Sequence, residues 1–248
     1  MTAALAGVAV VTGASGGIGR ATACALAAQG MSVCLTGRDA GRLQDAAKEI
    51  GLRAPQVLVH PADLSTDEGI RGLVARVDTD LRRIDVLVHA AGTIRLGNIE
   101  SCGWNDLDEQ HRINLRAPFL LTKAFLPMLK ETRGQVVFVN STAGLVAGAD
   151  NGLYAASKHA LRSLAGSIRD HVNPYGIRVV SVFPGRTATA MQEAVHRFEG
   201  RSYAAAELVQ ADDVAELIVG ALTLSRTAEV TDVMVRPMKK PSPARLTK

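Results

Sequence analysis

The sequence has few aromatic residues, few cysteines and no long apolar run. Phe, Trp and Tyr make up 4% of its 248 residues, so a surface for stacking nucleic-acid bases is not expected. Cys24, Cys34 and Cys102 lack the spacing of metal ligands, which suits a reducing compartment. No apolar stretch approaches the ~20 residues that span a bilayer, and no basic region precedes the first apolar run. We therefore expect a cytoplasmic protein that has no metal site and no membrane partner.

Excess positive charge is confined to the end of the chain. The formal net charge is +4, from 28 basic and 24 acidic residues. Five of the basic residues lie in 236–248, which contains three prolines and no acid, so 23 basic residues face 24 acidic ones in 1–235. A near-neutral body lacks the basic surface that binds nucleic acid. We expect one folded domain over 1–235 and a weakly ordered basic tail over 236–248.

Short apolar runs alternate with longer amphipathic stretches along the chain. The runs read as strands of a parallel sheet covered on both faces, and they span 8–12, 32–36, 56–60, 86–90, 135–140, 178–183 and 231–235. Helices are expected over 18–29, 39–50, 66–80, 104–130, 152–173 and 211–224. The alternation predicts an α/β protein with a single doubly wound (Rossmann) domain, whose seven-stranded, mostly parallel sheet carries helices on both faces. Ligands of such sheets bind at the carboxyl ends of the strands.

A glycine-rich turn follows the first expected strand and leads into a helix. It reads Thr12-Gly-Ala-Ser-Gly-Gly-Ile-Gly19. Glycines allow a tight turn and a close backbone approach to a pyrophosphate, and the N–H groups of the helix point toward the anion. Three glycines also make ordinary loops, so the location between strand and helix is what favours a dinucleotide site. The cofactor contacts expected here are Gly13, Ser15, Gly16, Gly17, Ile18 and Gly19.

The end of the second expected strand favours NADP over NAD. An enzyme that prefers NAD usually places an acid there for the ribose 2′-hydroxyl, about 20 residues after the glycines. Gly37 occupies that position and Arg38 follows it. A guanidinium group binds two oxygens of a 2′-phosphate at once. The alternative is that Arg38 is a solvated turn residue. Asp39 is expected to cap the next helix in either case.

Two further strand ends add expected cofactor contacts. Asp63, which precedes Leu64 after the third strand, is expected to accept a hydrogen bond from the adenine amino group. A helix cap is the alternative role for this region, and Ser65 or Thr66 can fill it. After the fourth strand, small residues let the backbone approach the cofactor; these are Ala90, Ala91 and Gly92. His89, just before them, is expected to be packed rather than catalytic.

Tyr154 and Lys158 stand four residues apart in an expected helix. That spacing places a phenol and an ammonium group on one helical face. A free phenol has a pKa near ~10, and a fixed cation beside it favours the phenolate. Alone, Tyr-x-x-x-Lys usually belongs to a solvated helix surface, and its meaning here depends on the dinucleotide site upstream.

Together these motifs resemble the short-chain dehydrogenase/reductase family over about residues 7 to 236. The glycine turn is similar to its cofactor motif, and His89-Ala-Ala-Gly92 is similar to its Asn-Asn-Ala-Gly motif with two replacements. The resemblance implies a catalytic tetrad of Asn114, Ser141, Tyr154 and Lys158. In it Tyr154 exchanges a proton with the substrate oxygen while a hydride passes to or from the nicotinamide. Lys158 lowers the pKa of the phenol, Ser141 orients the substrate oxygen, and Asn114 holds a water that links Lys158 to solvent.

The same resemblance implies further contacts beyond the sixth strand. Pro184, Gly185, Thr187 and Thr189 are expected against the carboxamide of the cofactor, with Thr189 the first choice for the hydroxyl contact and Thr187 the second. Residues 190–210 are expected to form a movable lid over the substrate. A mostly apolar pocket for a carbonyl or alcohol substrate is expected from Ile94, Leu96, Leu145, Val146, Leu153 and Met191.

The leading hypothesis is therefore an NADP(H)-dependent oxidoreductase that interconverts a ketone or aldehyde and an alcohol. One alternative is a catalytically silent nucleotide-binding scaffold or regulator with the same fold, and another is a different Rossmann enzyme such as a methyltransferase. Retention of all four tetrad residues disfavours the scaffold, and the methyltransferase would leave Ser141, Tyr154 and Lys158 at the family's spacing unexplained. The resemblance also implies a homodimer or homotetramer, paired through the long helices over 104–130 and 152–173.

Overall fold

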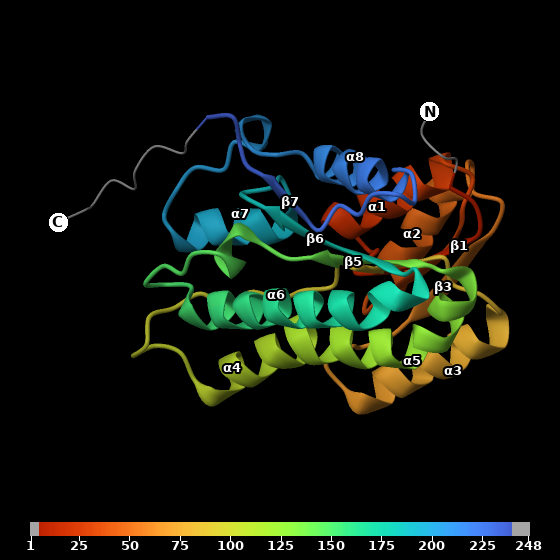
Figure 1. Ribbon diagram of the computed structural model, residues 1–248. Helices are drawn as coiled ribbons and strands as arrows, with labels where there is room; N and C mark the ends of the chain where they lie inside the picture. The colour runs from red at the N-terminus through yellow and green to blue at the C-terminus, as the bar shows by residue number, and fades with distance from the viewer. Residues whose placement is uncertain (1–4, 240–248) are drawn as a thin grey trace.

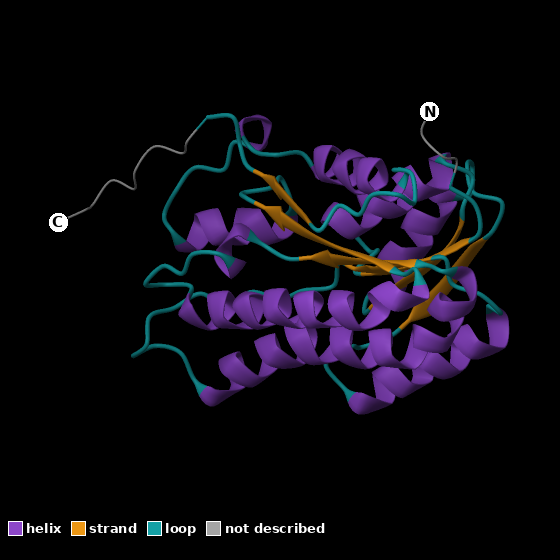
Figure 2. Cartoon of the chain, viewed as in Figure 1, coloured by secondary structure: helices purple, strands orange, loops and turns teal. Residues whose placement is uncertain are grey.

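Seven strands form the central sheet of the protein, which the computed structural model describes over residues 5–239 (Figures 1 and 2). The strands are β1 Val8–Thr12, β2 Ser32–Gly37, β3 Val57–Pro61, β4 Val86–His89, β5 Gln135–Val139, β6 Arg178–Pro184 and β7 Asp232–Val235. They lie in the order β3-β2-β1-β4-β5-β6-β7. Every neighbouring pair is parallel, so the sheet predicted as mostly parallel is parallel throughout.

Helices cover both faces of this sheet, as predicted (Figure 1). One face carries α1 Gly17–Ala28, α2 Ala40–Ile50 and α8 Ala211–Leu222, whose side chains form one apolar core with that side of the strands. The other face carries α3 Asp67–Asp80, α5 Ala117–Thr132 and α6 Gly152–Val172, which form a second core around Phe125 and Phe138. Burial on both sides explains why the inner strands β1, β2, β4, β5 and β6 are almost continuously apolar rather than alternating.

The helix predicted over 104–130 has a different internal structure. It consists of α4 Trp104–His111, one turn of π-helix over Arg112–Arg116, and α5. Asn114 lies in the wide turn and is fully buried. Such π turns inside helices are frequent at functional sites. A helical period in the sequence does not reveal the extra residue, because the turns on both sides remain regular.

The predicted lid segment, 190–210, begins with a helix, α7 Ala190–Phe198. Thr189 caps this helix and accepts a hydrogen bond from the Gln192 backbone N–H at 3.2 Å. Backbone hydrogen bonds between the Arg186–Ala188 region and Val209 close the base of the segment. The segment predicted to be a lid is therefore a folded unit that leaves the chain after β6 and returns to it at Val209.

The strand order reverses beside β1, which has β2 on one side and β4 on the other. At such a switch point the connections diverge to opposite faces and leave a crevice at the carboxyl ends of the strands. Thr12 holds this edge together, because its hydroxyl accepts from the N–H groups of Ala90 at 3.0 Å and Ala91 at 3.1 Å. The crevice opens directly beyond these residues.

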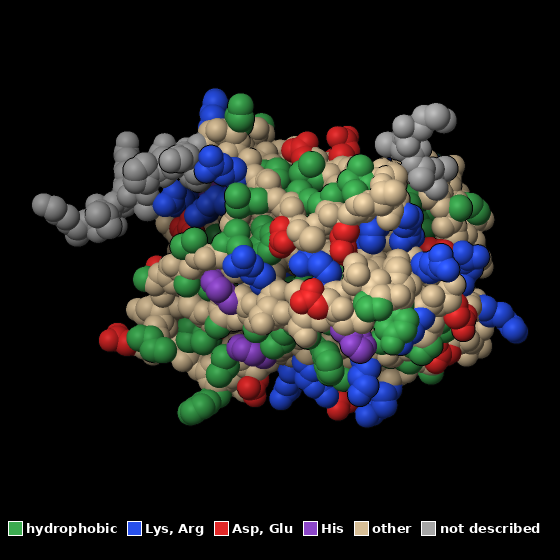
Figure 3. All heavy atoms as spheres, viewed as in Figure 1, with side chains coloured by type: hydrophobic (Ala, Val, Ile, Leu, Met, Phe, Trp, Pro, Cys, Tyr) green, Lys and Arg blue, Asp and Glu red, His purple; other side chains and the backbone are tan. Residues whose placement is uncertain are grey.

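Acidic and basic side chains are interspersed over most of the face shown in Figure 3. Within residues 5–239, none of the helices combines the length and the hydropathy that a membrane-spanning segment needs. Most of the predicted basic tail, 240–248, lies outside the described residues, so the division after residue 235 stays a prediction.

Candidate active site

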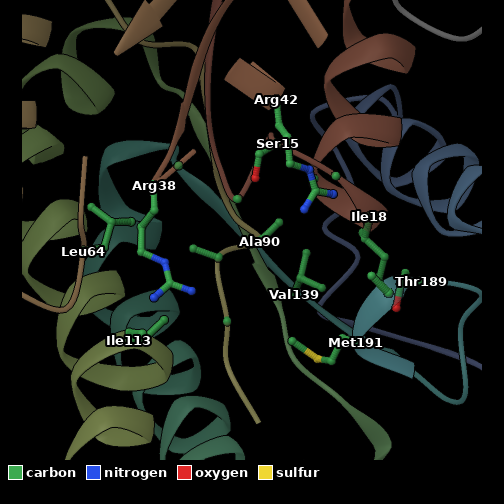
Figure 4. A pocket seen from close by; sticks show the side chains of 18 of the residues that line it. Ser15, Ile18, Arg38, Arg42, Leu64, Ala90, Ile113, Val139, Thr189 and Met191 are labelled. Atoms are coloured by element: carbon green, nitrogen blue, oxygen red, sulfur yellow. The ribbon is translucent and has the colours of Figure 1, made fainter. Parts of the chain in front are cut away.

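A cavity of 290 Å³ lies at the carboxyl edge of the sheet, beside the switch point (Figure 4). It gathers most of the predicted cofactor contacts from segments far apart in the sequence. These are Gly13, Ser15, Gly16, Gly17, Ile18, Gly19, Arg38, Asp63, Leu64, Ala90, Ala91, Gly92, Tyr154, Lys158 and Thr189.

The glycine turn forms the floor of this cavity because it leaves no room for side chains. Gly13 has a φ of 68°, and a Cβ there would lie 2.7 Å from the Ala91 nitrogen. A Cβ on Gly19 would overlap the carbonyl oxygen of Gly13. The first glycine thus permits the approach to β4, and the last permits α1 to pack against the end of β1.

Two guanidinium groups extend into the cavity, Arg38 from the end of β2 and Arg42 from the first turn of α2 (Figure 4). Arg42 lies over the glycine turn, where a Cβ on Gly16 would meet its Nη2 at 2.7 Å. Asp39 caps α2, as predicted, by accepting from the Arg42 backbone N–H at 3.0 Å. Sequence reasoning missed Arg42. The sequence feature that could have indicated it is a second arginine four residues after Arg38, about one helical turn away.

Asp63 enters the same cavity from the end of β3. Its Oδ1 accepts from the backbone N–H of Ser65 at 3.0 Å and from the Ser65 hydroxyl at 2.8 Å. Burial raises the pKa of Asp63, but the hydrogen bonds from Ser65 and the charge of Arg38 lower it, and the pKa ends below its ordinary value. Thr66, rather than Asp63, caps α3. The carboxylate is therefore ionised and faces the cavity.

Tyr154 and Lys158 lie on the buried side of α6, as their spacing predicted. Tyr154 is 8% exposed and Lys158 4%, which removes the alternative of a solvated helix surface. The Lys158 Nζ atom lies 5.8 Å from the centre of the Tyr154 ring and donates to the Val139 carbonyl at 3.0 Å. Burial lowers the pKa of Lys158 to about 8.

The electrostatics of Tyr154 differ from the expectation. Burial raises the pKa of its phenol, and a hydrogen bond with Ser141 partly opposes that effect. The predicted lowering of this pKa by Lys158 is not found, because the loss of water around the phenol dominates. Ser141 is held in place in turn, since its hydroxyl accepts from the Ala143 N–H at 3.1 Å.

Asn114 occupies the centre of a buried hydrogen-bond network. Its Oδ1 accepts from the Thr93 N–H, and its Nδ2 donates both to the Thr93 carbonyl and to the Ser157 hydroxyl, at 2.9, 2.9 and 3.0 Å. The Ser157 hydroxyl donates to the Tyr154 carbonyl at 2.8 Å. The amide of Asn114 thus joins the loop after β4 to the helical turn that carries Tyr154. Ser157, fully buried, was missed by sequence reasoning and had no signal there beyond its place next to Lys158.

A second cavity, of 440 Å³, adjoins the first. Tyr154, Asn140, Ile18, Thr189 and Met191 line both. Ser141 lies in the second cavity together with the predicted wall residues Ile94, Leu96, Leu145, Val146 and Met191, whereas Leu153 is not part of its lining. Pro184, Gly185 and Thr187, which were expected to contact the cofactor, also line this second cavity. Tyr154 therefore stands where the two spaces meet.

The histidines and cysteines do not form a further centre. Within residues 5–239 no group of three or more His, Cys, Asp or Glu is arranged to hold a metal ion. His89 is buried against Phe138 and its Nε2 bonds the Thr122 hydroxyl at 2.8 Å. Burial lowers the pKa of His89 to about 3, so it is neutral and packed, as predicted.

Comparison with known proteins places this arrangement in a family. The model of the short chain dehydrogenase family matches residues 7–200. A protein of Staphylococcus saprophyticus, named as an uncharacterized oxidoreductase, is 32% identical in an alignment 238 residues long, which covers 93% of this chain and 97% of that protein.

Solved structures agree with that match. An alcohol dehydrogenase from the archaeon Thermococcus sibiricus, complexed with 5-hydroxy-NADP, has a TM-score of 0.86 at 28% identity and covers 96% of this chain and 100% of its own. A metagenomic short-chain oxidoreductase in complex with NADP has a TM-score of 0.80 at 32% identity, with 94% and 97% covered. The chain belongs to the short chain dehydrogenase family, and it is a dehydrogenase/reductase.

Proposed function

We propose that this enzyme uses NADP(H) to interconvert a ketone or aldehyde and an alcohol, with Tyr154 as the general acid and base. The observation that carries the proposal is the position of Tyr154, which lines both the glycine-floored cavity and the adjoining cavity that contains Ser141. A proton donor at that junction reaches an oxygen bound in one space while the dinucleotide occupies the other.

The first cavity has the features of a dinucleotide site. Cβ atoms on Gly13 and Gly19 would fill the turn, and the following helix begins at Gly17, so backbone N–H groups face the place of a pyrophosphate. Arg38 and Arg42 give two guanidinium groups for a 2′-phosphate, whereas the position of the usual NAD-selective acid is Gly37. Two structural neighbours contain NADP or a derivative of it. These observations support NADP over NAD.

The residues divide the chemistry among them. When bound, the nicotinamide group supplies or accepts the hydride. The Tyr154 phenol donates its proton to the carbonyl oxygen in the reducing direction and takes it back in the oxidising direction. The Ser141 hydroxyl, hydrogen-bonded to Tyr154, orients that oxygen. Lys158 holds a positive charge near the phenol, and Asn114 fixes the backbone around both.

The test is turnover with NADPH and a panel of aldehydes and ketones, followed at the absorbance of reduced nicotinamide. The wild type should consume NADPH with at least one carbonyl, and Tyr154→Phe should lower kcat by about 10²–10⁴-fold while NADPH still binds. Tight NADPH binding without turnover by the wild type would favour the silent scaffold. Full activity of Tyr154→Phe would contradict the role of the phenol.

The cofactor preference has its own test. Arg38→Gln and Arg42→Gln should each weaken NADPH binding and leave NADH binding nearly unchanged, because only NADPH carries the 2′-phosphate. Arg53, an arginine that does not line the cavity, supplies a matched control as Arg53→Gln. Equal loss of both cofactors in the two cavity variants would contradict the assignment.

We also propose that the protein is a homodimer or homotetramer in the cytosol. A groove lies on the outer side of α5 and α6, where Leu115, Phe119 and Leu164 are bordered by Asp108, His111, Arg112 and Arg116, and Phe119 is 43% exposed. The three cysteines are free thiols, which fits a reducing compartment. Light scattering should give a multiple of the chain mass, and Phe119→Asp should lower that mass.

A further inference from the structure

The second cavity has one formally charged side chain in its wall within the described part of the chain. That residue is Arg186, which follows β6 by two positions. Apart from it the lining is apolar or neutral and polar, and the phenol of Tyr154 is kept protonated by burial. A guanidinium group in a pocket for a neutral substrate is unexpected, because desolvating a charge carries a free-energy penalty.

Glu199 orients this arginine from outside the cavity. Its two oxygens accept from Arg186 Nη1 at 2.8 Å and Nη2 at 2.7 Å. Glu199 is the first residue after α7 and does not line the cavity. Burial raises the pKa of Glu199, but the hydrogen bond and charge of Arg186 and the charge of Arg201 lower it below its ordinary value, so it remains ionised. Such a two-point contact fixes the plane of the guanidinium group.

Glu199 is shared between Arg186 and a second arginine. Arg201 Nε also lies 3.1 Å from Glu199 Oε2. One carboxylate therefore faces two guanidinium groups, so Glu199 is not the exclusive partner of Arg186. A guanidinium group has five N–H donors. Glu199 accepts two of those of Arg186, so three N–H donors of Arg186 are not used by Glu199. Figure 3 shows Lys and Arg side chains gathered beside hydrophobic ones near α7 and the end of the described chain.

From this geometry we infer that Arg186 is a specificity-determining residue, and that the preferred substrate is a carbonyl compound with an apolar body and a carboxylate. The inference rests on the proposed function, since it places the reacting carbonyl at Tyr154. The apolar body packs against the wall that includes Leu145 and Met191, and the carboxylate pairs with Arg186. Glu199 retains Arg201 as a partner when the substrate shares Arg186.

The experiment compares 4-carboxybenzaldehyde with its neutral methyl ester, methyl 4-formylbenzoate, as substrates with NADPH. The wild type should show a kcat/KM about tenfold higher for the acid, equivalent to about 1.4 kcal/mol, and the ratio should fall as salt is added. Arg186→Gln should lower kcat/KM for the acid about tenfold and leave the ester nearly unchanged. A preference for the ester in the wild type would overturn the inference, while reduction of the ester by itself reports on the proposed function.

A variant of Glu199, the ion-pair partner of Arg186, distinguishes recognition of the substrate carboxylate from a purely structural ion pair. Glu199→Gln leaves the charge of Arg186 uncompensated, so the preference for the acid should be kept or increased. If Arg186 and Glu199 only held α7 in place, both variants would lower kcat/KM equally for both substrates, and the inference would fail. Arg197→Gln is the matched control, because Arg197 lies on α7, pairs with Glu193 and does not line the cavity. Arg186→Lys should keep part of the preference.

Discussion

The two adjoining cavities are built in different ways. The first cavity, where we propose that the cofactor binds, has a floor made from one short stretch, Gly13–Gly19, whose backbone leaves no space for side chains. The second cavity, where we propose that the substrate binds, has walls made of side chains from distant segments, including Ile94, Leu145, Met191 and Met234. The first is therefore a property of a local motif, and the second depends on how the elements pack.

This difference predicts how each cavity responds to a substitution. The glycine turn tolerates almost no added atom. Its close contacts are with main-chain atoms, which cannot move aside by changing rotamer as a side chain can. A wall of methionine and leucine side chains adjusts when one member changes, because these side chains are flexible. Substitutions in the first half should therefore act on cofactor affinity, and those in the second on substrate selection.

Among the substitutions that contrast the two cavities, the largest effect is expected from Gly19→Ala. The added methyl group overlaps the Gly13 carbonyl, so the turn must shift, and overpacking of this kind costs about 1–3 kcal/mol. NADPH affinity, measured by fluorescence titration, should fall about tenfold or more. Gly72→Ala is the control, because a Cβ at Gly72 on α3 meets nothing within 4 Å and should stabilise the protein by about 0.4–1 kcal/mol. Unchanged affinity in Gly19→Ala would show that the turn is not the cofactor floor.

Ser157→Ala should have the next largest effect. Ser157 supports the turn of Tyr154, the residue at which the two cavities meet. The substitution leaves a buried N–H of Asn114 without its acceptor, which costs about 1–3 kcal/mol of stability. The kcat should fall more than KM rises, because the turn bearing Tyr154 loses its tie to Asn114. Thermal unfolding and steady-state kinetics together check this. Ser181→Ala, which removes another buried hydroxyl, should leave kcat nearly unchanged.

The lowered pKa of Lys158 predicts that the stability of the cofactor-free protein depends on pH. The native pKa of this lysine, about 8, lies below its ordinary value of 10.5. Between these values the unfolded chain keeps the proton that the native chain has lost, so the contribution of Lys158 to stability rises with pH. The free energy of unfolding of the wild type relative to Lys158→Met should therefore increase from pH 8 to pH 10. A flat difference across that range would refute the lowered pKa.

The smallest effect is expected from Met234→Ala on the substrate side. Met234 lines only the second cavity and is 66% exposed, so its loss removes little buried area. We expect KM for an apolar aldehyde to rise about twofold to fivefold, and NADPH affinity to stay the same. A change in NADPH affinity would mean that the two cavities are not separable in this way.

Much of the fold could be read from the chain because the signals are local. Continuous Val and Leu runs gave the seven strands within a few residues, and the alternation with helices gave their parallel arrangement. Arg38 was found because it follows a strand end. Arg42 was missed because it lies one turn into a helix, where an arginine ordinarily faces solvent.

Tertiary structure decided the remainder of the site. Ser157 gains its place in the network only when α6 packs beside the π turn at Asn114. Arg186 and Glu199 meet only because the chain at the end of α7 returns to the segment that follows β6. The pKa of Tyr154 follows from burial, which no spacing along the chain reports.

The sequence by itself determined the order of elements, the glycine turn and the shared helical face of Tyr154 and Lys158. Each depends on backbone geometry over a few residues, which the residue types nearly dictate. Only the tertiary structure decided which charges are paired, which hydroxyls are desolvated and where the two cavities join. These features depend on groups that the fold brings together from distant parts of the chain. The energies of the ion pairs and buried hydroxyls depend on how much water packing removes from around them.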